Sequence, residues 1–307
     1  MTLKNTMISL IVEPKTPPME WESFRTQHSN SIALDGYVIG PAKWCPITKC
    51  ANFNHHENVD RLSTRATCAQ VLMALRQGLL DNFKNFSIYV NDCDQDVCLS
   101  TFILLNGWRC ESVANPLLNK LVHVADMMDT CAGCYPFPVD MSFMAQMAWI
   151  FEPYTIFRNN GLDKKDSKSY RSVIDDVLHR INDYLVGGAG EIELDTRYEI
   201  LSASKKWSLV NEIGQQARMS MISDGIKAYV SCRNRSDGKW SYSIGKISNF
   251  IDFDIEKLFE IFNKIENLVS TKDKWGGSSL IGGSSRIAGS NLSPEIITKI
   301  INDHVGV

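Results

Sequence analysis

The chain has 307 residues, a formal net charge of −3 and a hydrophobic content of 44%. This length and composition exclude a disordered protein and allow one large domain or two of ordinary size. The sequence pI of about 6.1 excludes an overall basic field, so a long nucleic-acid partner is disfavoured.

The N-terminal apolar segment at residues 7–12 is too short for a signal peptide, and no apolar run approaches the roughly 20 residues of a membrane span. The nine cysteines lie in apolar or helical contexts, which predicts reduced thiols in a cytoplasmic protein without a membrane partner. Cys45 and Cys50 with Cys131 and Cys134 leave a four-thiolate zinc site open, with buried thiols as the alternative. A homodimer is compatible with the sequence.

From residue 7 to about 121, short apolar strands alternate with helical stretches, which is typical of an α/β domain. The pattern predicts strands at 8–12, 31–34 and 87–90, and helices at 66–80, 96–106, 141–157 and 169–186. Ser63 and Thr64 are candidate caps of the helix at 66–80. Residues 159–168 are predicted to form a loop, and the glycines at 187–190 to end the last helix.

A second pattern follows these glycines, so we predict two domains, 1–190 and 191–307. The second domain is predicted to contain helices at 207–223, 254–268 and 293–303, and strands at 227–232 and 240–247. The predicted fold class is therefore α/β, with a mainly parallel sheet in the N-terminal domain and a smaller C-terminal α+β domain.

Three carboxylates, those of Asp92, Asp94 and Asp96, follow the predicted strand at 87–90 at every second position. In an extended chain, alternate side chains point to the same side, so these oxygens would converge and repel one another. A divalent cation among them would remove the repulsion. A solvated turn that caps the next helix is the alternative.

A second polar motif, Asn54-His55-His56-Glu57, follows another short strand-like run. Imidazole beside carboxylate favours Mn²⁺, Fe²⁺ or Zn²⁺ over calcium. We predict that the two motifs form halves of one metal site. The alternative is that one histidine is exposed and the other is satisfied by a backbone carbonyl.

Residues 275–290 contain five glycines and five serines. Glycine lets backbone amides approach an anion, serine adds hydroxyl donors, and Arg286 adds a cation. The predicted substrate-binding residues are Arg65, Gly276, Gly277, Ser278, Gly282, Gly283, Ser284 and Arg286. A flexible surface loop, with Arg65 simply exposed, is the alternative.

Together these segments resemble the DHH phosphoesterase superfamily, which includes RecJ-like nucleases and family II inorganic pyrophosphatases. Residues 54–56 and the helix after them are similar to the Asp-His-His motif, and residues 92–96 to the Asp-x-Asp element. The loop at 276–289 is similar to that of the smaller DHHA1 domain. The chain differs in that Asn54 replaces an aspartate, family histidines near the acidic motif and the glycine loop are missing, and the acidic motif follows the histidines.

The resemblance implies a two-domain phosphohydrolase that acts on a nucleotide or another small phosphorylated metabolite. It implies one or two divalent ions, with Mn²⁺ preferred over Mg²⁺, Fe²⁺ and Zn²⁺, and catalytic roles for His55 and His56. The implied metal ligands are Asp35, His55, Asp92, Asp94, Asp96 and Asp126, with Asp129 as an alternative to Asp126. The alternative for Asp35 is an ordinary turn residue, and the alternative for Asp126 and Asp129 is a solvated helix face.

Two other functions are also compatible with the sequence. The departures from the family pattern would suit a catalytically inactive small-molecule-binding or regulatory protein. A metal-dependent hydrolase or lyase with a non-phosphate substrate would keep the ion and change the chemistry.

Overall fold

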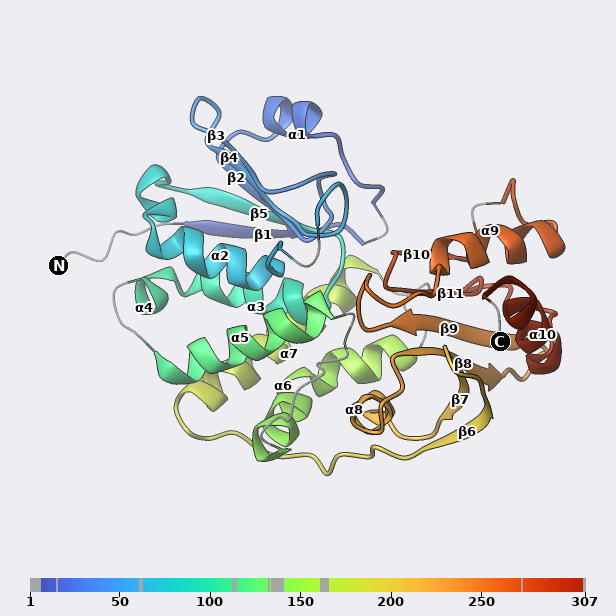
Figure 1. The fold of residues 1–307 in the computed structure, drawn as a ribbon. Helices are drawn as coiled ribbons and strands as arrows, with labels where there is room; N and C mark the ends of the chain where they lie inside the picture. Colours follow the sequence, from blue (N-terminus) through green and yellow to red (C-terminus); the bar gives the residue numbers. More distant parts are fainter. Residues whose placement is uncertain are drawn as a thin grey trace. The chain divides into compact units, whose positions relative to one another are not determined.

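The computed structural model describes residues 7–14, 16–60, 63–111, 115–131, 133, 141–160, 166–271 and 273–305. They form two compact units, one within residues 1–130 and 140–192 and the other mainly within 193–307 (Figure 1). Both units combine helices with a sheet, which confirms a mixed α/β fold. Among the described helices, none is long and apolar enough to cross a bilayer.

The sheet of the first unit is mainly parallel, as predicted. Its strands follow the order β1 (Ile8–Val12), β5 (Phe86–Val90), β2 (Ser31–Leu34), β4 (Cys50–Phe53) and β3 (Lys43–Cys45). Only β3, which the sequence pattern did not predict, is antiparallel to its neighbour among these strands. Because parallel strands end at the same edge, the residues that follow β2, β4 and β5 lie side by side.

Helices cover both faces of this sheet (Figure 1). On one face, Phe24 of α1 (Trp21–Gln27) packs against Ala33, Cys50 and Tyr89. On the other face lie α2 (Thr67–Arg76) and α3 (Gln95–Leu105), which pack against each other. Since α3 is buried from Asp96 to Leu104, its sequence lacks a polar face.

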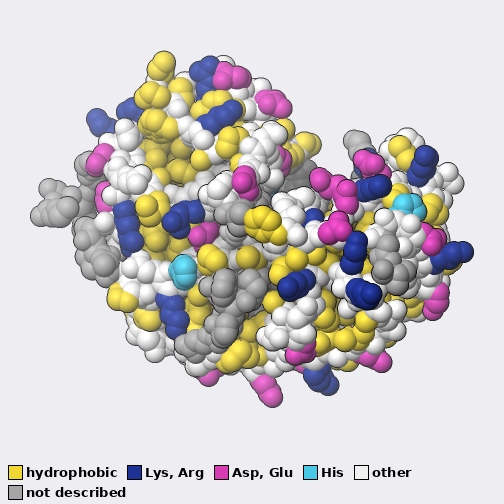
Figure 2. Space-filling model, in the orientation of Figure 1, with side chains coloured by type: hydrophobic (Ala, Val, Ile, Leu, Met, Phe, Trp, Pro, Cys, Tyr) yellow, Lys and Arg dark blue, Asp and Glu magenta, His cyan; other side chains and the backbone are white. Residues whose placement is uncertain are grey.

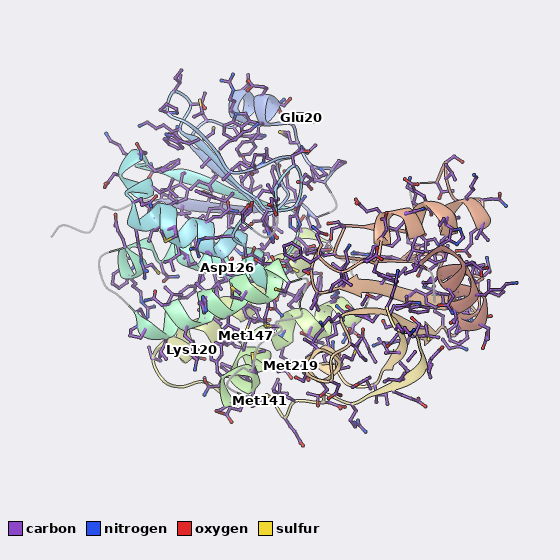
Figure 3. All side chains as sticks on the ribbon, viewed as in Figure 1. Glu20, Lys120, Asp126, Met141, Met147 and Met219 are labelled. Carbon is purple, nitrogen blue, oxygen red and sulfur yellow. The ribbon has the colours of Figure 1, made fainter. Side chains whose placement is uncertain are left out.

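The remaining helices of the first unit are α4 (Gly107–Cys110), α5 (Pro116–Thr130), α6 (Met141–Asn159) and α7 (Ser167–Leu185). The helices α6 and α7 confirm the predictions at 141–157 and 169–186; Figure 3 labels Met141 and Met147 on α6. The predicted helix at 66–80 ends early, because Gly78 adopts a positive φ and a 3₁₀ turn, η1 (Leu79–Asn82), follows. The predicted loop at 159–168 lies partly outside the described residues.

The second unit has a mixed sheet with the strand order β10-β11-β9-β8-β7-β6, in which only β7 and β8 pair in parallel among the described strands. Its elements are β6 (Tyr198–Ala203), β7 (Ser208–Glu212), α8 (Ala217–Ser223), β8 (Ala228–Asn234), β9 (Trp240–Lys246), α9 (Ile255–Ile265), β10 (Gly276–Gly277), β11 (Ile281–Gly283) and α10 (Pro294–Val305). Its core joins Val230 and Ile244 of the sheet with Phe262 of α9 and Trp275.

The helix predicted at 207–223 is wrong, because this segment forms the strand β7 and then the short helix α8. Leu209 and Val210 pair with β8 and are buried, so pairing across the sheet overrides the local helical pattern. Gly214 separates the two elements, and a Cβ there would lie 2.0 Å from the carbonyl oxygen of Asp195. The other predicted elements of this unit are confirmed as β8, β9, α9 and α10.

Acidic and basic side chains are interspersed over the described surface that Figure 2 shows. Hydrophobic side chains lie between them rather than in one continuous area. Such a mixed surface agrees with the small net charge of the chain.

Candidate metal centre

Two histidines and an aspartate meet at the carboxyl edge of the first sheet. Asp35 follows β2 with a φ of +49°, and Gly36 follows with a φ of +84°. His55 and His56 follow β4, so they are not held on opposite faces of a strand. Their Nε2 atoms lie 3.5 Å and 2.9 Å from the same Oδ1 of Asp35, and their rings are 4.6 Å apart. The positive φ favours glycine at position 36, and a Cβ there would come no closer than 3.4 Å to the His56 ring.

A second group of carboxylates surrounds the same nitrogen of His55. Nε2 lies 2.7 Å from Oδ2 of Asp129, on α5, and 3.6 Å from Oδ2 of Asp96, in the first turn of α3. The potential ligand atoms of Asp35, His55 and His56 lie within 4.8 Å of one another, and so do those of His55, Asp96 and Asp129. The structure thus brings both sequence motifs to His55.

The environment of His55 fits a bound cation. Its side chain is 1% exposed, and among the described residues neither ring nitrogen completes a hydrogen bond of acceptable geometry. A buried imidazole beside several carboxylate oxygens is satisfied either by its own protonation, as an ion pair with them, or by a bound cation. These groups of aspartate and histidine could therefore hold a metal ion.

The pKa values show how strongly the charges in this cluster interact. Burial alone would lower the pKa of His55, but the carboxylates of Asp129 and Asp35 raise it to about 11. Burial, together with the charges of Asp35 and Asp129, raises the pKa of Asp96 to about 7. Burial opposes ionisation of Asp35 too, but the two imidazoles hold its pKa well below the usual range.

The start of α2 ties the cluster together. The backbone N–H groups of Thr67 and Cys68 each donate to an oxygen of Asp96 at 2.6 Å, and the Thr67 hydroxyl donates to Oδ1 of Asp35 at 2.9 Å. The N-cap position is Ala66, without a side-chain cap of its own, so the predicted caps Ser63 and Thr64 do not serve. Distant carboxylates satisfy the first amides of α2 instead.

Asp126 has a different role from Asp129, although both lie on α5 (Figure 3 labels Asp126). Its Oδ1 accepts from the Ala66 N–H at 2.6 Å, and its Oδ2 lies 3.4 Å from Arg65. Among the described residues, Asp126 belongs to neither potential ligand group. Asp129, the alternative, is the one that faces His55. The side chain of Arg65 is 61% exposed, which agrees with the alternative that this predicted substrate-binding residue is simply a surface residue.

Asp92 and Asp94 also lie at this edge, but the chain bends there and does not continue as a strand. Asp94 caps α3 by accepting from the Val97 N–H at 2.9 Å, and Asp92 accepts from the Cys93 N–H at 2.7 Å. Neither joins a potential ligand group among the described residues. Burial and the nearby Asp35, Asp92 and Asp96 raise the pKa of Asp94, so the expected mutual repulsion of the carboxylates is present.

Asn54, which stands where the DHH motif that residues 54–56 resemble has an aspartate, has a structural role. Its amide Nδ2 donates to the carbonyl oxygens of Val38 and Gly40, both at 3.1 Å, and to Glu57 at 2.8 Å. Its Oδ1 accepts from the His56 N–H at 3.0 Å. The residue is fully buried, and its contacts hold the turn after β2 against the start of the histidine motif.

In the second unit, two carboxylates of the chain itself hold the glycine-rich loop. Asp273 accepts from the Ser285 hydroxyl and from the N–H groups of Ala288, at 2.9 Å, and Ile287, at 3.4 Å. Glu266 accepts from the Trp275 indole at 2.6 Å and from two donors at positions 290 and 291. The amides next to Arg286 are thus already occupied by an anion.

Close packing explains most of the predicted glycines of this loop. A Cβ on Gly282 would lie 2.4 Å from Phe259, and one on Gly283 would lie 2.2 Å from the Tyr242 carbonyl oxygen. Gly277 has a φ of +153° and faces Gly282 across the β10-β11 pair. Ser278 and Ser284 hydrogen-bond to neighbouring backbone, while Gly276 faces open space.

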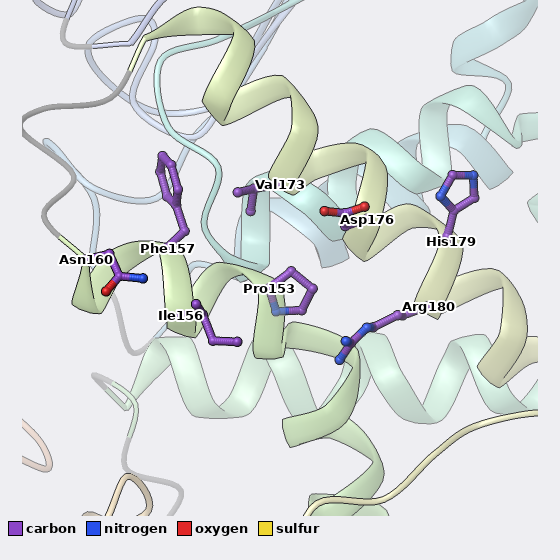
Figure 4. A pocket seen from close by; sticks show the side chains of 8 residues that line it. All are labelled: Pro153, Ile156, Phe157, Asn160, Val173, Asp176, His179 and Arg180. Carbon is purple, nitrogen blue, oxygen red and sulfur yellow. The ribbon is translucent and has the colours of Figure 1, made fainter.

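The first unit also has a hollow between α6 and α7 (Figure 4). Pro153, Ile156, Phe157 and Asn160 line it from α6, and Val173, Asp176, His179 and Arg180 line it from α7. Arg180 is held within this helix pair by the Trp149 carbonyl and the Glu152 carboxylate. The hollow therefore contains none of the residues of the cluster around His55.

The local sequence pattern gave no sign of Thr67, whose contact with Asp35 depends on how α2 meets the sheet edge. The proposed four-thiolate zinc site lies partly outside the described residues, because Cys134 is not among them.

Comparison with protein-family models, with curated proteins and with solved structures finds no match to this chain.

Proposed function

We propose that the first unit binds a divalent ion at His55 and hydrolyses a phosphate ester or anhydride of a small phosphorylated metabolite, such as a nucleotide. The observation that carries this proposal is a buried imidazole nitrogen with carboxylate oxygens of three aspartates between 2.7 and 3.6 Å away. The resemblance of residues 54–56 and 92–96 to DHH phosphoesterase motifs supports the phosphate substrate. We also propose that residues 1–190 correspond to the metal-binding domain of that family and residues 191–307 to its smaller DHHA1 domain.

His55, Asp96 and Asp129 would hold the ion, together with Asp35. Because one imidazole nitrogen has one lone pair, His55 serves a single ion, and the two overlapping ligand groups then define one position. Mixed imidazole and carboxylate ligands favour Mn²⁺, with Fe²⁺, Zn²⁺ and Mg²⁺ as alternatives. When bound, such an ion activates water and withdraws charge from a phosphoryl oxygen.

The chain itself would orient and protonate the substrate. The His56 side chain is 37% exposed, and its Nε2 is fixed by Asp35 at 2.9 Å. It can therefore reach a substrate from a defined direction and give a proton to the leaving oxygen. The Thr67 hydroxyl holds the same oxygen of Asp35, so this carboxylate keeps its position during the reaction.

A catalytically inactive binding or regulatory protein is the second candidate, and Asn54 favours it. Its amide is committed to backbone carbonyls, so this position supplies no carboxylate to the site. Such a protein would bind the same ion and ligand without turnover. Metal content and hydrolysis therefore have to be measured on the same samples.

The test uses two matched variants of α5, Asp129→Asn and Asp126→Asn. Asp129→Asn should lower the Mn²⁺ affinity by roughly 100-fold or more and abolish hydrolysis of bis(p-nitrophenyl) phosphate and p-nitrophenyl phosphate. Asp126→Asn keeps an oxygen that can accept from Ala66, so both properties should persist. Calorimetry with Mn²⁺ and a colorimetric assay give the two values.

Stoichiometric Mn²⁺ in a wild-type protein that hydrolyses neither ester nor a panel of nucleotides would support the binding protein. Equal Mn²⁺ affinities for the wild type and Asp129→Asn would reject the site itself. Turnover that inorganic phosphate and vanadate do not inhibit would reject phosphoryl chemistry.

A further inference from the structure

Two cysteines face each other at the edge of the first sheet. Cys45 of β3 is paired directly with Cys50 of β4, and the loop 46–49 joins the two strands. Directly opposed residues of an antiparallel pair have Cα atoms about 4.5–5.5 Å apart, with side chains on the same face. Disulfides span Cα distances of about 4.4–6.8 Å. The backbone of this hairpin is therefore already spaced for a disulfide.

Both sulfur atoms have polar neighbours in the same turn. Cys50 Sγ lies 2.8 Å from the His28 carbonyl oxygen and 3.7 Å from that of Thr48. The hydroxyl and the amide of Thr48 nearby, with the Ile47 amide and the charge of Arg25, lower the pKa of Cys45 to about 7. About half of Cys45 is therefore ionised at neutral pH, and the thiolate is the reactive form of a thiol.

Three other described thiols of this unit provide a contrast. Burial raises the pKa of Cys68, Cys93 and Cys98, and nearby aspartates raise it further. The Cys98 thiol donates to the Cys93 carbonyl oxygen at 3.2 Å. These three cysteines should stay protonated and react slowly, so they serve as internal controls.

We propose that Cys45 and Cys50 form a peroxide-sensitive dithiol that closes to an intramolecular disulfide across the β3-β4 hairpin. The Cys45 thiolate attacks an oxygen of a hydroperoxide, the O–O bond breaks, and a sulfenic acid forms while the leaving oxygen is protonated to water or an alcohol. Cys50 then attacks the Cys45 sulfur, the S–O bond breaks, and the departing hydroxide takes the Cys50 proton and leaves as water. The two thiols lose two electrons in total, and the peroxide gains them.

The sequence makes this pair easy to map, because Lys43 and Lys49 flank Cys45 and place the two cysteines on separate tryptic peptides, 44–49 and 50–61. The reduced full-length protein is treated with one equivalent of hydrogen peroxide, its free thiols are alkylated, and the digest is analysed by mass spectrometry without reductant. The two peptides should appear joined, lighter by two hydrogen atoms than their sum, and should separate on reduction. In a separate measurement at pH 7, iodoacetamide should label Cys45 at least about tenfold faster than Cys93.

The Cys50→Ser variant should trap the first step, because it removes the second thiol and keeps a donor near the His28 carbonyl. Dimedone should then label Cys45, whereas wild type is labelled weakly. Cys45→Ser should leave Cys50 reduced under the same treatment. Unlinked peptides in oxidised wild type, or labelling of Cys45 no faster than Cys93, would overturn the proposal even if a variant did not fold.

Discussion

The two units contain carboxylate clusters that differ in how their oxygens are satisfied. In the second unit, Glu266 and Asp273 accept hydrogen bonds from an indole, hydroxyls and backbone amides, and they hold a loop in place. In the first unit, Asp35, Asp96 and Asp129 crowd around a buried imidazole. Asp35 and Asp96 also accept hydrogen bonds from the start of α2, so the first cluster does not differ by a lack of donors. It differs in that three carboxylates share one buried imidazole, which indicates a site for a cation.

Asn54 provides the strongest test of this comparison, because Asn54→Asp would add a carboxylate to the first cluster. The new charge would face the Val38 and Gly40 carbonyl oxygens and the Glu57 carboxylate, without the amide that now satisfies them. We expect a loss of about 3 kcal/mol in the free energy of unfolding and no additional Mn²⁺. Urea denaturation and metal analysis measure the two effects.

The exposed Asn58 is the matched control, since Asn58→Asp should leave both stability and metal content unchanged. A stable Asn54→Asp protein with one more bound ion would show that a carboxylate at this position can act as a metal ligand.

The convergence of the two motifs at one sheet edge could be predicted from the sequence, because the signals for it are local. Asp35 follows an apolar strand, the histidine motif follows another, and all of these strands are parallel. Local sequence signals could not identify Asp129 and Thr67 as members of the cluster, since their contacts depend on how α5 and α2 pack against the sheet edge. In the same way, residues 207–223 read as one helix because their pairing with β8 is invisible in a local pattern.

The charges around His55 predict that metal binding is coupled to protons. With a pKa of about 11, His55 is protonated in the metal-free protein at neutral pH, and it must lose that proton to bind an ion. Its stabilising contribution to the metal-free fold is fully present below the unfolded pKa of about 6.5 and is lost as the pH rises through about 11. The affinity for Mn²⁺ should therefore rise about tenfold per pH unit between pH 7 and 8.

Asp96 adds to this dependence at lower pH, because its pKa of about 7 lies above the ordinary value for an aspartate. Below pH 7 it also has to release a proton, so the affinity should fall more steeply there. Titration calorimetry in two buffers of different ionisation enthalpy counts the released protons. Identical binding enthalpies in both buffers would mean that His55 is not a ligand.

The glycine-rich loop can be tested with a matched pair of substitutions. Gly282→Ala would place a Cβ 2.4 Å from both Phe259 and the Gly276 carbonyl oxygen, and it should lower the free energy of unfolding by about 2 kcal/mol. Gly276→Ala meets no atom within 4 Å and should change stability by less than about 0.5 kcal/mol. Urea denaturation compares the two.

The Gly276→Ala and Gly282→Ala variants also distinguish a packing role of the loop from a role in substrate binding. If the loop binds phosphate, Gly276→Ala should raise the KM for a phosphate ester at unchanged stability. An unchanged KM would assign the exposed glycine, like its buried neighbours, to the structure of the hairpin.

The last prediction concerns Asp273, a carboxylate of the second unit that holds the glycine-rich loop. Its replacement should cause only a small loss of stability. Burial alone would raise the pKa of Asp273, but the Ser285 hydroxyl and the Ala288 and Ile287 amides lower it. Its contribution is therefore present above the unfolded pKa of about 3.9 and is lost as the pH falls through the lower folded value. Asp273→Asn weakens these hydrogen bonds and should cost about 1 kcal/mol at pH 7.

Because the charge is the cause, the deficit of Asp273→Asn relative to wild type should shrink as the pH is lowered from 5 toward 3. Glu260→Gln, on the exposed face of α9, is the control and should follow wild type at both pH values. Denaturation curves at each pH give the differences. Mn²⁺ affinity should be the same in all three proteins, and a deficit of Asp273→Asn that stayed constant from pH 5 to pH 3 would show that the charge is not its cause.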